Sequence, residues 1–371
     1  MWGDIAIAFL LAFITTFMIT PQTIKLANKL GAVDSPKDQR RINKITMPRL
    51  GGLAVIAGFL ISIAYLLIVM TIENKINLYE ESYNLKLLGF LTGGLLISIV
   101  CFVDDIRGVP ALGKLAVQIM AAIICVKSGI RIGNFNIAFL EAENLDTYVS
   151  VILTIGWIVG ITNAINLIDG LDGLSTGICI ISCISLLIIF SLNNSPLIAI
   201  ILITALCGAL VGFLPYNFNP AKTFIGDTGS NFLGYCIAII SILGIAKTYT
   251  AIVIVSPLIV LSLPVFDTTF AIIRRVIKGK SLKAIVKPDA EHLHHKMIRK
   301  GFSQKQAVLI LYGISATFGM FAIILLDSGL WKALSFALII IVIVALGYKE
   351  AFSHKLLSDT QDEKNNLEEK Q

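Results

Sequence analysis

The chain has 371 residues, of which 56% are hydrophobic and only 15% are charged, and its formal net charge at pH 7 is +6. An ordinary soluble domain carries about 25% charged residues, so this composition excludes a typical soluble globular protein and indicates a protein that lies among membrane lipid. The modest positive charge is explained by loops on the cytoplasmic side of a membrane, and no nucleic-acid partner is needed to account for it.

Segments that suit transmembrane helices occur almost from end to end. Crossing the hydrocarbon core of a bilayer takes about 20 mainly apolar residues, and we predict an all-α, multi-pass membrane protein with about 11 transmembrane helices. These are expected at residues 3–20, 51–71, 87–103, 111–127, 148–165, 174–191, 196–214, 231–246, 251–272, 307–326 and 331–347. Residues 1–348 then form one transmembrane domain, and the polar residues 349–371 form a disordered cytoplasmic tail.

Lysine and arginine are concentrated in alternate connections between these segments. The connections at 21–50, 104–110, 166–173, 215–230 and 273–306 hold most of them, whereas the opposite connections hold little beyond Lys75, Arg131 and Lys247. Because positive charge marks the cytoplasmic side, we place the N-terminus outside and the C-terminus in the cytoplasm. The same trace puts every strongly polar cluster on the cytoplasmic face, which predicts one polar site there.

The first two polar clusters flank the second and third spans. The sequence Pro-Arg-Leu-Gly-Gly, from Pro48 to Gly52, opens the second span, where its glycines permit close helix packing and Arg49 is placed to meet a phosphate. Asp104 and Asp105 end the third span, and two adjacent carboxylates repel each other unless a cation or a shared proton compensates. They mark the membrane interface or belong to a site, and negative charge at a helix C-terminus favours the site.

A stripe of polar residues ends the fifth span. Asn163, Asn166, Asp169 and Asp172 follow one another at intervals of three, so they lie on nearly one face of a helix. A polar seam between membrane helices is the alternative, but it needs fewer such groups. Gly170 within the stripe would let a ligand approach the backbone closely, and we therefore predict a binding site.

A glycine-rich turn opens the eighth span. It runs from Phe224 to Ser230 as Phe-Ile-Gly-Asp-Thr-Gly-Ser. Such a turn before a helix presents free backbone N–H groups to an anion, and the carboxylate of Asp227 can hold a hard cation.

Histidines and an acidic residue mark the region after the ninth span. His292, His294 and His295 lie in a basic loop, where imidazoles beside cations suit a diphosphate. A zinc site and a simply solvated loop are the alternatives. Asp267, near the end of the ninth span, either lines the same site or forms an ion pair with a neighbouring arginine.

In this order and over most of the chain, the five motifs resemble those of the polyprenyl-phosphate N-acetylhexosamine-1-phosphate transferase family, which belongs to glycosyltransferase family 4. The resemblance implies a magnesium-dependent reaction, with Mn²⁺ as the alternative ion, on the cytoplasmic face of the bacterial cell (inner) membrane. Undecaprenyl phosphate attacks the β-phosphate of a UDP-amino sugar, which releases UMP and leaves a lipid-linked diphospho-sugar. The family also suggests a homodimer.

The resemblance assigns roles by position. Asn166 and Asp227 look like the metal ligands. Asp104 resembles the catalytic carboxylate beside the lipid phosphate, Asp105 supports it, and Asp169 and Asp172 belong to the same catalytic set. The resemblance also implies that the aromatic ring of Phe224 stacks on uracil. The full set of implied substrate contacts is Arg49, Asn163, Gly170, Leu171, Phe224, His292, His294 and His295.

Two departures bear on the choice of sugar. The muramoyl-pentapeptide branch has three consecutive histidines and a Pro-Thr-Met-Gly-Gly entry, whereas this chain reads His-Leu-His-His and Pro-Arg-Leu-Gly-Gly. Both resemble the N-acetylglucosamine branch, which starts teichoic acid, O-antigen (lipopolysaccharide) or enterobacterial-type polysaccharides. We therefore expect UDP-N-acetylglucosamine as donor, with a phospho-N-acetylmuramoyl-pentapeptide transferase as the alternative. A secondary transporter would place its site near the bilayer midplane, which the cytoplasmic position of these clusters disfavours.

Overall fold

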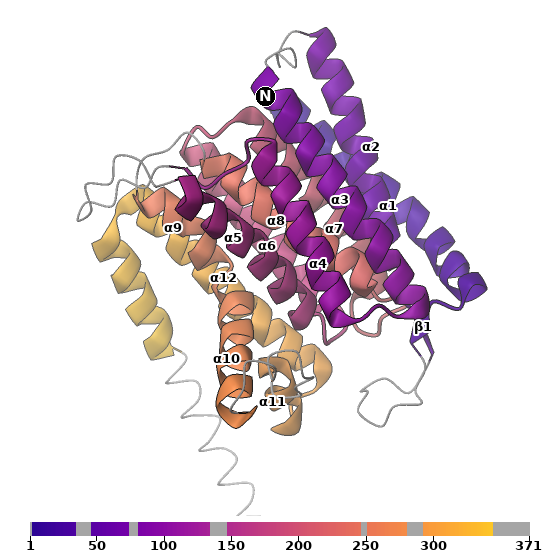
Figure 1. The fold of residues 1–371 in the computed structure, drawn as a ribbon. Coiled ribbons are helices and arrows are strands. Elements are labelled where there is room, and N and C mark those ends of the chain that lie inside the picture. The colour runs from indigo at the N-terminus through magenta and orange to yellow at the C-terminus, as the bar shows by residue number, and fades with distance from the viewer. Residues whose placement is uncertain are drawn as a thin grey trace, which may run out of the picture.

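The computed structural model describes residues 2–34, 46–73, 81–133, 147–245, 251–279 and 292–343, and the predicted tail lies outside them. The described chain is nearly all helical (Figure 1). Its helices are α1 (Trp2–Leu30), α2 (Gly51–Ile72), α3 (Glu81–Arg107), α4 (Ala111–Lys127), α5 (Thr147–Ile168), α6 (Leu174–Leu192), α7 (Leu197–Asn217), α8 (Gly226–Ile245), α9 (Ala251–Val260), α10 (Ser262–Gly279), α11 (Leu293–Arg299) and α12 (Gln304–Ser328). A shorter apolar helix, Leu330–Ile343, follows α12.

Within the described residues, 8 helices are long and apolar enough to cross a membrane, namely α1, α2, α3, α5, α6, α7, α8 and α12. They coincide with eight of the predicted segments, and the protein is a multi-pass membrane protein. Helix α4, with 17 residues, is shorter than these. The single span expected over 251–272 is two helices, because α9 ends at Val260 and α10 starts at Ser262. Pro264 lies in the first turn of α10, where the missing backbone N–H of proline costs no hydrogen bond within the helix.

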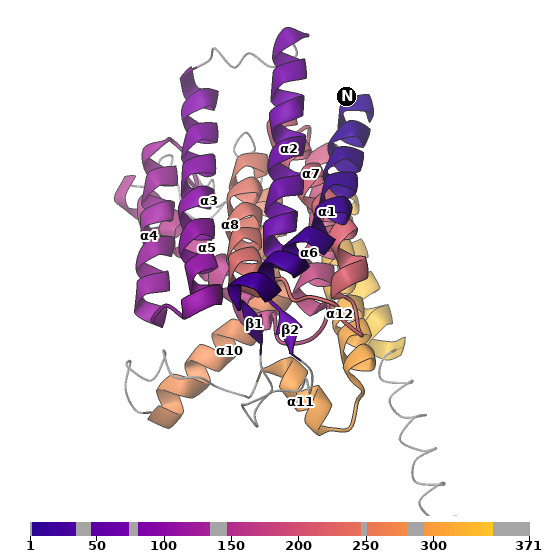
Figure 2. The same ribbon diagram turned by 90° about the vertical axis from the view of Figure 1, so that its right-hand side faces the viewer.

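The helices run side by side, and the parts that carry polar residues gather at one end of the bundle. In Figure 2 the N-terminus of α1 lies at one end, and the strands, α10 and α11 lie at the other. Helix α8 is nearly enclosed, since it packs against α2, α3, α5, α6 and α7. The strands β1 (Val33–Asp34) and β2 (Met47–Pro48) form one antiparallel pair below α1 and α2.

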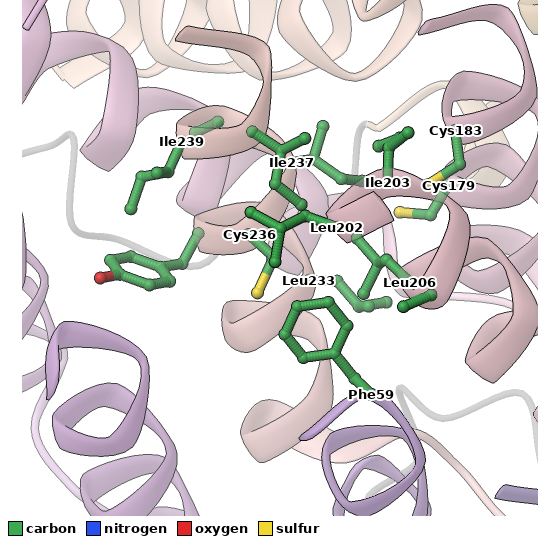
Figure 3. Close-up of a cluster of buried hydrophobic side chains, with 14 of the residues drawn as sticks. Phe59, Cys179, Cys183, Leu202, Ile203, Leu206, Leu233, Cys236, Ile237 and Ile239 are labelled. Carbon is green, nitrogen blue, oxygen red and sulfur yellow. The ribbon is translucent and has the colours of Figure 1, made fainter. Parts of the chain in front are cut away.

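The core of the bundle is apolar and closely packed. Figure 3 shows side chains of α2, α6, α7 and α8 meeting in it, among them Phe59, Leu206 and Leu233. Small residues bring some helices into backbone contact, as is common in membrane bundles. A Cβ atom on Gly52 of α2 would overlap the Cα atom of Gly229 in α8, so these two helices are fixed to each other at the end that carries the polar residues.

A loop before α8 is joined to the start of α2 by backbone hydrogen bonds. The N–H of Phe224 donates to the carbonyl of Pro48 at 2.8 Å, and the N–H of Gly51 donates to the carbonyl of Phe224 at 3.0 Å. The next pair, Gly52 N–H to Ile225 carbonyl, follows at 2.9 Å. These bonds place the two glycine-rich motifs of the sequence against each other, although about 175 residues separate them.

Candidate functional site

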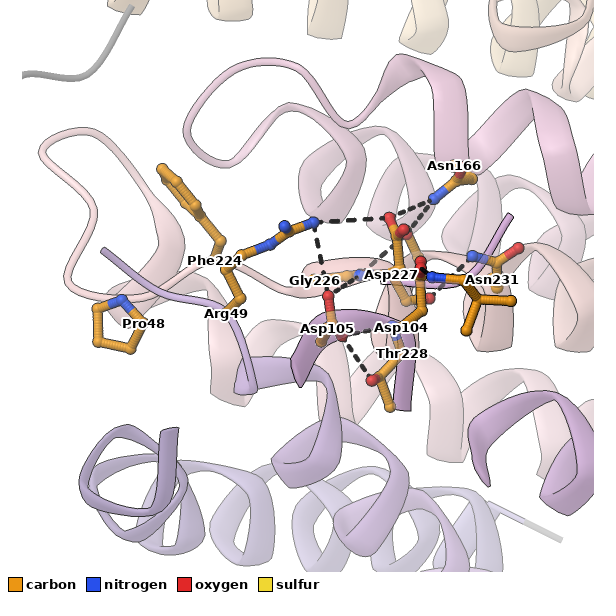
Figure 4. Close-up of polar contacts among 12 residues, drawn as sticks. Pro48, Arg49, Asp104, Asp105, Asn166, Phe224, Gly226, Asp227, Thr228 and Asn231 are labelled. Carbon is orange, nitrogen blue, oxygen red and sulfur yellow. Dashed lines mark hydrogen bonds and ion pairs between the residues drawn. The ribbon is translucent and has the colours of Figure 1, made fainter. Parts of the chain in front are cut away.

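Asp227 lies in the first turn of α8 and is held there by Asp105. The carboxylate of Asp105, in the last turn of α3, accepts the backbone N–H groups of Asp227 and Thr228 at 2.9 Å each and the hydroxyl of Thr228 at 2.6 Å. The first N–H groups of a helix have no partner within it, so Asp105 acts as a cap supplied by another helix. Asp105 thereby fixes where the Asp227 side chain points (Figure 4).

Two cations lie among the three carboxylates of this cluster. Lys114 of α4 bridges Asp104 and Asp227, with its Nζ 2.8 Å from Asp104 Oδ2 and 2.7 Å from Asp227 Oδ2. Arg49 lies 3.5 Å from Asp105 and 3.9 Å from Asp227 through Nη2. Three acidic side chains against two basic ones leave the cluster with a surplus of acidic groups, which favours the approach of a further cation.

Asn166 of α5 completes the surroundings of Asp227. Its Nδ2 donates to Asp227 Oδ1 at 3.0 Å and to Ser230 Oγ at 2.8 Å, so its Oδ1 is the atom that a cation would take. Asn163 lies one turn further from the polar end and donates to Gln118 Oε1 at 2.6 Å. Gln118 in turn donates to Asn231 Oδ1 at 2.8 Å. Asn166 therefore faces the site, whereas Asn163 belongs to a layer of amides beneath it.

A pocket of about 250 Å³ opens beside this cluster and takes in most of the predicted residues. Its lining comprises Asp34, Arg49, Asn166, Asp169, Gly170, Leu171, Asp172, Asn217, Phe224, Gly226, Asp227, His295 and Gln304. Asp169 accepts the Ser175 hydroxyl at 2.6 Å. Loss of water around the Asp169 carboxyl raises its pKa to about 7, although the hydrogen bond from Ser175 and the charge of Arg49 act in the opposite direction.

Phe224 and Asp172 also line this pocket. One oxygen of Asp172, Oδ2, accepts Asn219 Nδ2 at 3.0 Å and the N–H of Ala221 at 3.1 Å. The other oxygen, Oδ1, is buried and has no hydrogen-bond partner among the residues that the structure describes. Gln304, at the start of α12, accepts a bond from the same Asn219 amide at 3.1 Å. The pocket lining therefore includes an aromatic ring and a buried acceptor that a ligand's N–H could satisfy.

The three predicted histidines have three different environments. His292 pairs with Asp267 at 2.8 Å. His294 is only 2% exposed and both its ring nitrogens are without a hydrogen-bond partner, so burial lowers its pKa to about 3. A Cβ atom on Gly170 would overlap the His294 ring. Of the three, His295 is the one that lines the pocket.

Comparison with known proteins decides the family. Residues 87–245 match glycosyl transferase family 4. The chain is 37% identical over 342 residues to a Bacillus subtilis protein named "Probable undecaprenyl-phosphate N-acetylglucosaminyl 1-phosphate transferase", covering 92% of this chain and 90% of that protein. The chain belongs to glycosyl transferase family 4. The family that the sequence motifs indicated is thereby confirmed.

Other relatives of this family 4 transferase represent both sugar branches. A decaprenyl-phosphate N-acetylglucosaminephosphotransferase of Mycobacterium leprae is 31% identical over 333 residues, which cover 83% of this chain and 80% of that protein. A phospho-N-acetylmuramoyl-pentapeptide-transferase of Staphylococcus aureus is 32% identical over 340 residues, which cover 87% of this chain and 97% of that protein.

Several residues of the family 4 site were not predicted from the sequence. Lys114 is the most important of them, because it bridges Asp104 and Asp227. A lysine in an apolar segment is a signal of function in itself, and Lys114 stands four residues into the predicted fourth span. Asn217 and Gln304 carry no comparable signal, since each is an ordinary polar residue near a helix end.

A second cavity of the transferase is apolar. It has a volume of about 640 Å³ and lies between α5, α8, α9 and α10. Its lining includes Leu153, Trp157, Ile242, Leu258 and Ile272. An elongated hydrocarbon group would find almost no polar atoms on these walls.

Proposed function

We propose that this protein transfers N-acetylglucosamine 1-phosphate from UDP-N-acetylglucosamine to undecaprenyl phosphate on the cytoplasmic face of the bacterial inner membrane. The products are UMP and a lipid-linked diphospho-sugar that starts a cell-envelope polysaccharide. The observation that carries the proposal is a single pocket that is lined both by Asp227 and Asn166 and by Phe224 and Asp172. A diphosphate bound to a cation suits the first pair, and a nucleobase suits the second.

The residues beside Asp227 fit a magnesium ion. The described residues contain no cluster of three or more His, Cys, Asp or Glu side chains that could form a metal site without other ligands. Mg²⁺ keeps several waters and takes one or two protein carboxylates together with substrate phosphates, so Asp227 and the amide oxygen of Asn166 are a suitable protein share. When bound, such an ion neutralises charge on the attacking and leaving oxygens of a phosphoryl transfer.

The basic residues of the cluster would orient the phosphates. Phosphoryl transfer needs positioning and charge neutralisation more than covalent help from the protein. Lys114 already holds Asp104 and Asp227 together, and Arg49 lines the pocket next to them, so both cations lie where a diphosphate would arrive. A phosphate monoester has a second pKa of about 6, so an ionised lipid phosphate can attack without a general base, and Asp104 then serves to orient it.

Two residues of the pocket suit a uracil base. Uracil presents an N–H at position 3, and Asp172 Oδ1 is a buried acceptor without a partner. Phe224, which lines the same pocket, offers a ring on which the base can stack, a contact worth roughly 1–3 kcal/mol per base in nucleic-acid complexes. The apolar cavity between α5, α8, α9 and α10 suits the prenyl chain of the acceptor.

UMP release by the detergent-purified protein tests the proposal. Undecaprenyl phosphate and Mg²⁺ would be supplied with UDP-N-acetylglucosamine or with UDP-muramoyl-pentapeptide, each with and without EDTA. We expect EDTA-sensitive UMP release from UDP-N-acetylglucosamine alone. Release from the pentapeptide donor alone would move the protein to peptidoglycan synthesis, and no release from either donor would contradict the transferase mechanism.

A further inference from the structure

Asp267 holds the start of the histidine segment from a different helix. It lies in α10, its side chain is 10% exposed, and it accepts two hydrogen bonds from the residues that begin α11. His292 Nδ1 lies 2.8 Å from Asp267 Oδ2, and the N–H of Leu293 donates to Asp267 Oδ1 at 2.8 Å. His292 is the residue that precedes α11, and its own side chain makes no capping bond. Asp267 therefore supplies the cap that the local sequence does not.

These contacts also fix the orientation of the His292 ring. Because a carboxylate can only accept, Nδ1 is the ring nitrogen that donates to Asp267, and Nε2 is the other one. That nitrogen, Nε2, lies 3.4 Å from Nη2 of Arg275, a donor on the same helix as Asp267. His292 is buried and both of its nitrogens point toward α10. His292 is thus an anchor, and no part of its ring is left to contact a substrate in this arrangement.

The anchored helix α11 carries the two histidines that reach the pocket region. His294 packs against Gly170, and the centroid of its ring is 4.2 Å from that of His295. His295 lines the polar pocket together with Asp227 and Asp172. Because α11 has only 7 residues, a displacement at its first residue moves both histidines.

We propose that Asp267 is a positioning residue for the nucleotide-sugar pocket, which acts by holding His292 so that α11 keeps His294 and His295 against the pocket. The role in donor binding rests on the proposed function, whereas the anchoring of α11 does not. Among the described residues, Asp267 is hydrogen-bonded to His292 and Leu293 and not to Asp104, Asp105 or Asp227, so we expect its main effect in the binding of the donor.

A rival explanation places Asp267 with the lipid acceptor. Its neighbours Val265 and Thr268 line the apolar cavity, so a substitution at Asp267 could act by disturbing that wall. The two explanations differ in which substrate is affected. Positioning of α11 predicts a change in the KM for the UDP-sugar, and disturbance of the cavity predicts a change in the KM for the prenyl phosphate.

The test uses Asp267→Asn, His292→Ala and the double variant of the full-length protein. Asparagine has the shape of aspartate but keeps only one acceptor oxygen. It can therefore accept from His292 Nδ1 or from the N–H of Leu293, and it sets its NH₂ group against the other of these two donors. Loss of a charge-assisted hydrogen bond is expected to raise the KM for the UDP-sugar about tenfold, with the KM for prenyl phosphate unchanged. Because the two residues act as a unit, the double variant should also show about a tenfold rise instead of a hundredfold rise.

Amide hydrogen exchange gives a readout that does not depend on turnover. The backbone amides of α11 should exchange about tenfold faster in Asp267→Asn than in the wild type, with α8 unchanged. Asp327→Asn is the matched control, since this exposed carboxylate contacts the hydroxyl of its neighbour Ser328, and we expect wild-type kinetics and exchange. A raised KM for prenyl phosphate, additive effects in the double variant, or unchanged exchange of α11 would each overturn the proposal.

Discussion

Replacement of Lys114 tests the charge balance of the site most directly. Its ammonium lies 2.8 Å from Asp104 and 2.7 Å from Asp227, and its side chain is 23% exposed. Lys114→Met keeps most of the length and the apolar stem of the side chain but removes the charge. The two carboxylates then face each other without the cation between them, and Arg49, 3.9 Å from Asp227, is the remaining cation of the cluster.

The size of the effect follows from Coulomb's law. A magnesium ion on Asp227, with Mg–O distances of about 2.1 Å, would lie about 4 to 5 Å from the present position of the ammonium. A divalent and a monovalent cation at that distance repel by about 7 kcal/mol at an effective dielectric constant of 20. Lys114 is partly exposed and can turn toward the substrate, so most of this repulsion is relieved. We expect Lys114→Met to strengthen Mg²⁺ binding by only about 1.4 kcal/mol, which is a tenfold change in affinity.

The assay is UMP release as a function of Mg²⁺ concentration. Lys114→Met should lower the Mg²⁺ concentration at half-saturation about tenfold, and it should also lower kcat because the diphosphate loses a cationic contact. Lys222→Met is the control, since Lys222 is exposed and lies over the ring of Tyr216, 5.9 Å from its centroid. An unchanged or raised half-saturation concentration in a folded Lys114→Met protein would refute the reasoning.

Three further predictions concern the pocket and its cover. Asp172→Asn should raise the KM for UDP-N-acetylglucosamine about tenfold with little change in kcat, because a buried acceptor is replaced; donor titrations measure this. Gly170→Ala should destabilise the protein by about 1–3 kcal/mol and weaken donor binding, because the added Cβ atom overlaps the His294 ring; thermal melting and donor titrations measure both. His294→Gln should flatten the loss of thermal stability between about pH 6.5 and 4.5. The pKa of His294 is about 3 in the fold and 6.5 in its absence, so the unfolded chain takes up the proton first and the native state loses stability as the pH falls.

Each of these predictions has an outcome that contradicts it. A donor KM for Asp172→Asn equal to that of the wild type would remove this residue from the nucleobase contact. Gly313→Ala is the control for Gly170→Ala, because nothing lies within 4 Å of the added atom; equal melting of the two variants would show that the His294 contact is unimportant. Parallel melting curves against pH for wild type and His294→Gln would mean that His294 is not buried as a neutral ring.

Much of the site could be read from local sequence. Asp227 was expected from its glycine-rich turn, and Asn166 from the regular spacing of the polar stripe; both lie where the pocket opens. Such signals are visible because a charge or an amide beside an apolar span is costly without a function. Lys114 gave the same kind of signal and was overlooked. The role of Lys114 depends on its contact with Asp227, which lies 113 residues away in the chain.

The amino-acid sequence alone predicts a helical multi-pass membrane protein, because lipid leaves a long apolar segment few other ways to satisfy its backbone. It also shows which polar groups lie next to those segments. Contacts between the helices establish the role of each group: Asp105 caps α8, His292 is an anchor on Asp267, and α9 and α10 are separate helices. The first two outcomes depend on a partner from another helix, which leaves no pattern in the neighbouring residues, whereas Pro264 is a local signal for the start of α10.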